Sequence, residues 1–151
     1  SASLVGSEMC IRDSFNITYQ NGEITAVSYD ENGKEINRYS LQTAGKDTVL
    51  QVRPEEKTVK PEGLAFIQLQ YTDSKGIWKP MEKHNIKVTV ENGVLKGLGS
   101  PAPYVKGNYT DHTVATYYGE AMAVVQADGN GPVKVTVADE ERFYVAEIPC
   151  E

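Results

Sequence analysis

Short runs in which every second residue is apolar constrain the fold of this chain more strongly than any other feature of its sequence. The runs are Ala65–Tyr71, Ile86–Val90 and Val133–Val137. Period-two alternation is typical of strands that bury one face and expose the other. The turn dipeptides around such runs are Asn21-Gly22, Asn32-Gly33 and Asn92-Gly93. Both residue types tolerate a positive φ, so we expect a tight hairpin turn at each.

The spacing of the strands predicts an all-β chain that contains an immunoglobulin-like antiparallel β-sandwich. Residues 46–151 have the length of one complete sandwich, which takes roughly 100 residues. Residues 15–45 hold about three strands, too few to close a two-layer core. We therefore interpret residues 15–45 as the C-terminal strands of a preceding, truncated β-sandwich domain. In the second domain we expect one core that contains Ile67, Leu69, Val88, Val90, Val124, Val135 and Val137.

The first residues follow neither the period of a helix nor that of a strand. Residues 4–14 read LVGSEMCIRDS, and MCIRDS back-translates to ATG TGT ATA AGA GAC AG, the mosaic end of a transposon-based sequencing adapter. We interpret residues 1–14 as a translated adapter scar and leave them out of fold and function. On this interpretation Cys10 is not half of an evolved disulfide with Cys150, and whether the two meet stays open.

A lead-in motif precedes the second domain and reads Y-D-x-x-G-K-E and then L-x-T-A-G. Its residues are Tyr29-Asp30, Gly33-Lys34-Glu35, Leu41 and Thr43-Ala44-Gly45. Further matches are Ala26, Leu64-Ala65-Phe66, Asp73, Gly76, Gly93, Leu95, Gly97, Gly99-Ser100, Tyr118-Gly119, Ala121, Ala123 and Val124-Val125. This pattern resembles the C-terminal β-sandwich region of bacterial glycoside hydrolase family 2 enzymes, the multidomain β-galactosidases and their relatives. Bacterial surface immunoglobulin-like repeats share the strand pattern but lack this lead-in.

The resemblance implies a non-catalytic accessory domain of such an enzyme, of β-galactosidase or β-glucuronidase type, packed on the rest of its parent. In the family the two catalytic glutamates lie on an upstream barrel, so we expect this fragment to have no catalytic residue and not to be an enzyme. Two alternatives stay open: a carbohydrate-binding module of the same enzyme, and a surface adhesion repeat. The resemblance implies a bacterial origin, while the compartment (cytoplasm, periplasm or exterior) stays unknown.

The segment KGLGSPAPYVKGNYTDH, residues 96–112, holds most of the candidate binding residues. Sugars are recognised by aromatic platforms with hydrogen-bonding groups beside them. The candidate sugar-contacting residues are Trp78, Tyr104, Tyr109, Asp111, His112 and Tyr118. Tyrosine is also common in strands and sandwich cores. We therefore favour a long sheet-to-sheet connection, with Tyr104 and Tyr109 packed on the sandwich or on residues 15–44 and no catalysis in the segment.

Composition narrows the partners further. The formal net charge of −6 argues against nucleic acid and anionic membranes, which require a clustered positive field. His84 and His112 are the only histidines, and they form no metal-binding spacing, so we expect no metal and no cofactor. Residues 15–44 expose a strand edge, which predicts strand-mediated self-association or pairing with the adapter segment.

Overall fold

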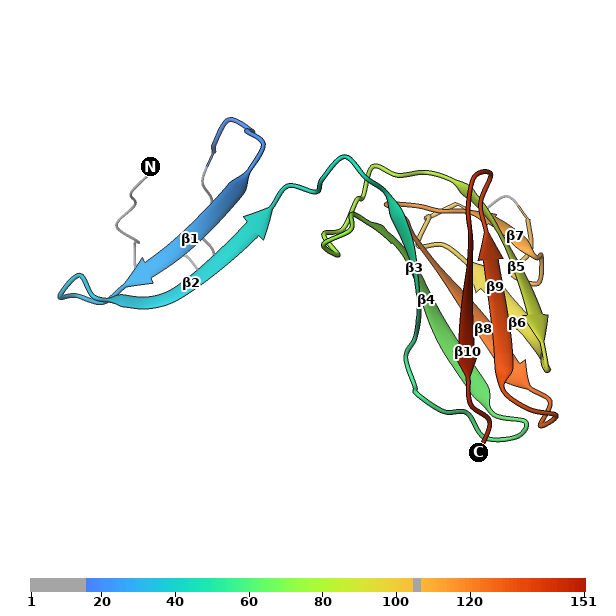
Figure 1. Ribbon diagram of the computed structural model, residues 1–151. Helices are drawn as coiled ribbons and strands as arrows, with labels where there is room; N and C mark the ends of the chain where they lie inside the picture. Colours follow the sequence, from blue (N-terminus) through green and yellow to red (C-terminus); the bar gives the residue numbers. More distant parts are fainter. Residues whose placement is uncertain (1–15, 105–106) are drawn as a thin grey trace. The chain divides into compact units, whose positions relative to one another are not determined.

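The computed structural model describes residues 16–104 and 107–151. These residues fall into two compact units, divided between Thr43 and Ala44. The first unit is a two-stranded sheet and the second contains two four-stranded sheets (Figure 1). The described residues contain no helix, so the all-β fold class that the alternation predicted is confirmed.

The first unit is an antiparallel hairpin of strands β1 (Glu23–Tyr29) and β2 (Glu35–Gln42). In its turn, Oδ1 of Asp30 accepts the backbone N–H groups of Asn32 at 2.9 Å and Lys34 at 2.8 Å. Gly33 has a φ of 77°, whereas Asn32 is not left-handed. The Asn-Gly pair therefore forms a longer turn built on Asp30, not the two-residue turn that we expected.

One face of this hairpin is apolar. Ile24 is the cross-strand partner of Leu41, and Ala26 is the partner of Tyr39. Ile24, Tyr39 and Leu41 are 49 %, 66 % and 56 % exposed. A two-stranded sheet has no second layer with which to bury such a face.

The opposite face of the hairpin is polar. Thr25 Oγ1 and Ser40 Oγ are hydrogen-bonded at 2.7 Å, and Gln42 Nε2 donates to Glu23 Oε2 at 3.0 Å. This division of faces is typical of a strand pair whose apolar side belongs to a core.

Two expectations for residues 15–45 are wrong. Residues 16–20 form no strand, so the described part of this segment has two strands, not about three. Asn21-Gly22 is not a hairpin turn. Instead the Gly22 carbonyl accepts the Thr43 N–H at 2.8 Å, which closes the open end of the hairpin.

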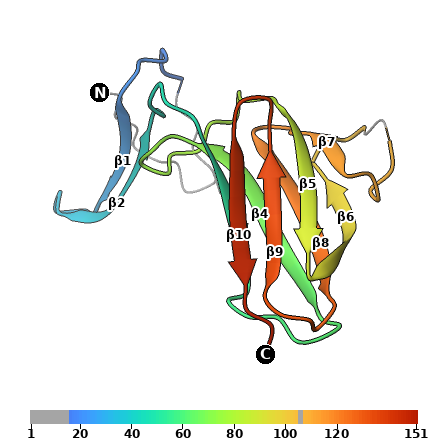
Figure 2. The ribbon, with the colours of Figure 1, turned by 45° about the vertical axis from the view of Figure 1, so that its right-hand side comes forward.

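The second unit is a sandwich of two antiparallel sheets that face each other (Figures 1 and 2). One sheet has the order β3-β4-β8-β6 and the other β10-β9-β5-β7. The strands are β3 (Val49–Pro54), β4 (Leu64–Thr72), β5 (Asn85–Glu91), β6 (Gly93–Gly99), β7 (Thr113–Ala115), β8 (Glu120–Ala127), β9 (Val133–Ala138) and β10 (Phe143–Ile148). Their order confirms the predicted sandwich.

The core lies between the two sheets and is built from the alternating residues. Ile67, Leu69, Val88, Val135 and Val137 are fully buried, as the alternation predicted. Val90 is partly buried and packs against the same core.

The prediction that Val124 belongs to this core is wrong. In β8 the residues Ala121, Ala123, Val125 and Ala127 are buried, so Val124 lies on the other face of the strand. Val124 and Val125 are adjacent and both apolar, so alternation alone does not show which of them faces the core. Small alanines at the inward positions hid the true register.

Asn92-Gly93 does not form a hairpin. Asn92 has a φ of 57° and joins β5 of one sheet to β6 of the other. Its side-chain amide donates to the Pro132 carbonyl at 2.9 Å, which ties this crossover to the β8–β9 turn.

At the C-terminal end, Cys150 forms a parallel bridge with Val59. Cys150 is a free cysteine in the described part of the chain. The adapter scar at residues 1–14, Cys10 and the added strand expected from that segment all lie outside the described residues.

Candidate functional site

Residues 96–112 connect the two sheets of the sandwich. Their first part is the end of β6, and β7 begins at Thr113 in the opposite sheet. The connection lies at the end of the sandwich away from the C-terminus (Figure 2). The prediction of a sheet-to-sheet connection is confirmed.

Asp111 organises this connection from within. Its Oδ2 accepts the Asn108 N–H at 2.9 Å, and its own N–H donates to the Asn108 carbonyl at 3.0 Å. A Cβ on Gly107 would lie 2.8 Å from the same Oδ2. The Asp111 carboxylate is thus committed to a turn of its own loop.

His112 continues the sheet beyond β7. Its carbonyl accepts the Val88 N–H at 2.9 Å, and its Nδ1 lies 3.2 Å from the Val88 carbonyl oxygen. The side chain and backbone of His112 therefore both pair with β5, which is a structural role.

Trp78 and Tyr118 form a separate cluster at the β7–β8 turn. The indole N–H of Trp78 donates to the Tyr118 carbonyl at 2.9 Å. Tyr118 itself has a φ of 51°, and its ring meets that of Tyr117 edge-on with centroids 4.5 Å apart. The indole hydrogen bond of Trp78 thus holds a turn that contains a left-handed residue. The Trp78 side chain is 44 % exposed.

The two loop tyrosines behave differently. Tyr104 is 93 % exposed, so the expectation that it packs on the sandwich is wrong. Tyr109 lies against β6, because a Cβ on Gly99 would be 2.8 Å from its Cε1. Its carbonyl accepts the Leu98 N–H at 2.7 Å, and yet the residue is 63 % exposed. Tyr109 is therefore an exposed ring held in place by its backbone and by a glycine.

These candidates line two different hollows. Tyr104 and Asp111 line a cavity of about 740 Å³ together with Tyr117. Tyr109 lines a groove of about 540 Å³ on the outer face of the β3-β4-β8-β6 sheet. The six candidates for sugar contact are accordingly not gathered in one site.

The groove beside Tyr109, which we call the β6–β8 groove, was missed by the sequence analysis. Its floor includes Gly97 and Gly99, and Met122 of β8 lines it as well. Gln68 and Glu120 supply polar groups to the lining. Two glycines at alternate positions of one strand were the available signal, because they leave the second half of one face of β6 without side chains.

A second constellation involves the start of the sandwich. Oδ2 of Asp73 accepts the Gly45 N–H at 2.7 Å, and Oδ1 accepts the N–H groups of Lys75 at 2.9 Å and Ile77 at 2.8 Å. Gly45 is the last residue of the L-x-T-A-G motif, and Asp73 is one of the further matches to the family pattern. The structure joins them into one clamp.

Asp47 lies beside this clamp, because a Cβ on Gly45 would be 2.8 Å from its Oδ1 and 3.4 Å from Asp73 Oδ2. Two neighbouring carboxylates invite comparison with an acid–base pair. The hydrogen bond from the Gly45 N–H lowers the pKa of Asp73, and hydrogen bonds from Ser74 lower the pKa of Asp47. A general acid that works near neutral pH needs a raised pKa. The lowered pKa values of Asp47 and Asp73 therefore suit a structural role and not acid catalysis.

Lys79, Glu82 and His84 form a third polar cluster. Glu82 accepts from His84 Nε2 at 2.9 Å, Lys79 Nζ at 3.0 Å and Thr48 Oγ1 at 3.1 Å. These contacts lower the pKa of Glu82 to about 2, and the hydrogen bond from His84 has the largest effect. Lys79 also donates to the Asp47 carbonyl at 3.0 Å, which fastens this loop to the start of the sandwich.

Two further kinds of site can be assessed for residues 16–104 and 107–151. They hold no group of three or more His, Cys, Asp or Glu side chains placed to bind a metal ion. Within the same residues, no helix has the length and apolar character that a membrane span requires.

The fold defines the chain as an immunoglobulin-like β-sandwich preceded by a β-hairpin. Residues 49–142 match the family model described as glycoside hydrolase family 2 C-terminal domain 5. The chain belongs to this family.

A curated relative, β-galactosidase BoGH2A of Bacteroides ovatus, is 26 % identical over 142 residues. That match covers 91 % of this chain and 17 % of the relative, so the chain spans a small part of the relative's length.

Solved structures share the fold. A glycosyl hydrolase family 2 member from Bacteroides cellulosilyticus superposes with a TM-score of 0.83 at 23 % identity, over 89 % of this chain and 18 % of that protein. A β-glycosidase from Bacteroides vulgatus superposes with a TM-score of 0.76 at 20 % identity, over 88 % of this chain and 18 % of the β-glycosidase chain.

Proposed function

We propose that this chain is a non-catalytic accessory region of a glycoside hydrolase family 2 enzyme of the β-galactosidase type. The observation that carries the proposal is the family match over residues 49–142. The β-galactosidase relative supports the type of the parent. The match also favours this function over a surface adhesion repeat, which was the alternative outside the family.

In this proposal, residues 46–151 form the accessory domain, and residues 15–45 complete a β-domain that precedes it in the parent enzyme. The apolar face formed by Ile24, Ala26, Tyr39 and Leu41 supports the second assignment. The rest of the parent is the partner of this chain, and its preceding β-domain covers that apolar face.

The non-catalytic role is supported by the state of the carboxylates. Retaining hydrolysis needs one carboxyl group that holds its proton and a second one about 5–5.5 Å away. Hydrogen bonds from the side chain and backbone of Ser74 lower the pKa of Asp47, and those from backbone N–H groups, that of Gly45 above all, lower the pKa of Asp73. Contacts from the side chains of His84, Lys79 and Thr48 lower the pKa of Glu82 to about 2. None of these three groups is suited to protonate a leaving group.

A chimera tests the accessory role. The segment of β-galactosidase BoGH2A that aligns with this chain is deleted in one variant and replaced by this chain in another. We expect the deletion to lower the thermal unfolding midpoint, and the chimera to recover part of the loss with KM unchanged. A chimera no more stable than the deletion variant contradicts the proposal.

A further inference from the structure

We infer that the β6–β8 groove is a binding site for a neutral oligosaccharide, with Tyr109 as its stacking platform. The groove lies on the outer face of the β3-β4-β8-β6 sheet and is lined by Gln68, Gly97, Gly99, Tyr109, Glu120 and Met122, among others. The choice of a glycan among neutral ligands rests on the proposed function. The site itself goes beyond that function.

The Tyr109 ring is placed beside the groove without a ligand. An exposed aromatic side chain that is free to rotate loses entropy when it binds a ligand. Tyr109 is 63 % exposed, but the Leu98 N–H holds its carbonyl and the Cβ-free backbone of Gly99 lies directly against the ring. The ring is thus positioned before any ligand arrives.

The floor of the groove is shaped by two glycines of β6. Gly97 is the cross-strand partner of Val124, and Gly99 is the partner of Met122. A side chain at Gly99 would collide with the Tyr109 ring, whereas a Cβ at Gly97 would meet only the Tyr109 carbonyl oxygen at 3.8 Å. The two glycines therefore leave a hollow of about 540 Å³ between the ring and β8. Small-molecule sites commonly have volumes of about 300–1,000 Å³.

Two side chains, Gln68 and Glu120, bring polar groups to the mostly apolar groove. Gln68 and Met122 are cross-strand partners, and Gln70 and Glu120 are the next pair along the same face. Gln70 Nε2 donates to Glu120 Oε1 at 2.7 Å, which orients both side chains. Oriented amide and carboxylate groups beside an apolar ring can hydrogen-bond hydroxyls while the ring covers the apolar face of a sugar.

The charge of the lining selects among sugars. Among the described residues that line the groove there is no lysine or arginine, and Glu120 is acidic. A uronic acid carboxylate would meet a like charge without a cation to offset it. The groove therefore favours a neutral glycan over a glucuronide-containing one.

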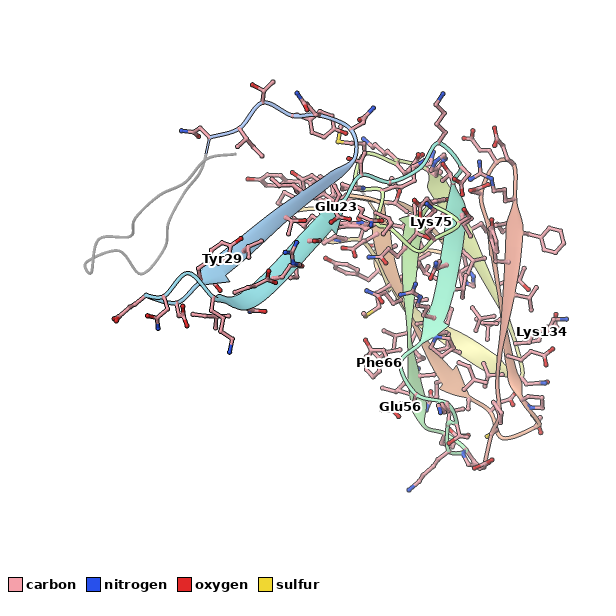
Figure 3. The ribbon with its side chains drawn as sticks, turned by 60° about the vertical axis from the view of Figure 1, so that its left-hand side comes forward. Glu23, Tyr29, Glu56, Phe66, Lys75 and Lys134 are labelled. Atoms are coloured by element: carbon pink, nitrogen blue, oxygen red, sulfur yellow. The ribbon has the colours of Figure 1, made fainter. Side chains whose placement is uncertain are left out.

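A neighbouring protein surface is the other possible occupant, because the apolar face continues to Phe66. Phe66 is the cross-strand partner of Val124 and is 40 % exposed. Figure 3 shows its side chain on the outside of β4. Gln68 and Glu120 add polar groups to a mostly apolar lining, and Gln70 beside them orients Glu120. We assign the glycan on these groups together with the positioned ring of Tyr109.

The test is calorimetric titration of the 151-residue chain with galactan, xyloglucan and glucuronide oligosaccharides. We expect millimolar or tighter binding of a neutral oligosaccharide and weaker binding of the glucuronide. Tyr109→Ala should weaken the binding roughly tenfold or more, because stacking is lost. Tyr104→Ala is the matched control, since Tyr104 belongs to the same loop but does not line the groove, and it should bind like the parent chain.

Three results would overturn the inference: no heat with any neutral oligosaccharide, equal losses in both tyrosine variants, or a preference for the glucuronide. Circular dichroism and thermal unfolding show whether each variant is folded. If Tyr109→Ala does not fold, amide chemical shifts of Gly97 and Gly99 during titration of the parent chain decide instead. None of these outcomes bears on the accessory role, which the chimera tests separately.

Discussion

The hydroxyl of Tyr71 donates to Oδ2 of Asp139 at 2.8 Å, and this bond connects the two sheets of the sandwich. Tyr71 is a fully buried residue of β4, and Asp139 lies in the β9–β10 turn of the opposite sheet. Burial raises the pKa of Tyr71, so the phenol stays protonated and remains the donor. The backbone N–H groups of Glu141 and Arg142 complete the hydrogen bonding of Asp139.

Tyr71→Phe should therefore lower the free energy of unfolding by about 1.5–3 kcal/mol, because a buried carboxylate loses a donor. Tyr144→Phe is the control, since Tyr144 is only partly buried. It should change the free energy by less than about 0.5 kcal/mol. Urea unfolding of the two variants measures both values, and equal effects would show that the bond across the sandwich contributes little.

The Asp73 clamp gives a second prediction. Asp73→Ala removes the acceptor of three backbone N–H groups, those of Gly45, Lys75 and Ile77, and should lower the thermal midpoint by several degrees. Asp128→Ala is the control, because within the described residues the Asp128 side chain accepts a single backbone N–H, that of Asn130 at 2.9 Å. If both variants melt at the same temperature, the clamp is not a principal support of this turn.

Glu82 predicts a specific pH dependence. Its folded pKa of about 2 lies below the ordinary value of 4.5, so the stability that it contributes is complete above pH 4.5. That stability is lost as the pH falls from 4.5 towards 2. Glu82→Gln should therefore be less stable than the parent chain by about 1 kcal/mol near pH 7, with the difference vanishing near pH 2. A difference that is independent of pH would contradict the charge of Glu82 as its cause.

The hairpin predicts self-association of the chain in solution. Among the described residues the apolar face around Leu41 is exposed, so sedimentation velocity should show a dimer or larger species that grows with protein concentration. Leu41→Lys should reduce this association. Gln42→Lys, one residue further and on the polar face, should leave it unchanged. Monomeric behaviour of the parent chain at all concentrations would remove this expectation.

Much of the fold could be predicted from alternation alone. The inward residues of β4 and β9 alternate cleanly with polar ones, so Ile67, Leu69, Val135 and Val137 were assigned correctly. The rule failed in β8, where the inward positions are mostly alanine and Val124 and Val125 are adjacent. The hairpin predicted at Asn92-Gly93 was wrong for a different reason. A local turn signal does not say whether the next strand stays in the same sheet.

The site was less predictable, because it depends on contacts across the sequence. Tyr104 and Tyr109 look alike as loop tyrosines, and only the placement of Gly99 beneath Tyr109 separates them. Similarly, Asp73 and Gly45 are 28 residues apart, and nothing local shows that one binds the other. Gln68 and Glu120 carried no signal, since polar residues on the outer face of a sheet are ordinary.

Hydrolysis by the purified 151-residue chain tests the central claim most directly. We expect the chain to cleave aryl β-galactosides and aryl β-glucuronides no faster than buffer does, because no suitable acid and nucleophile pair is present among the carboxylates described above. Turnover above the buffer rate that survives repurification, and that is lost in Asp47→Asn or Asp73→Asn, would contradict the account.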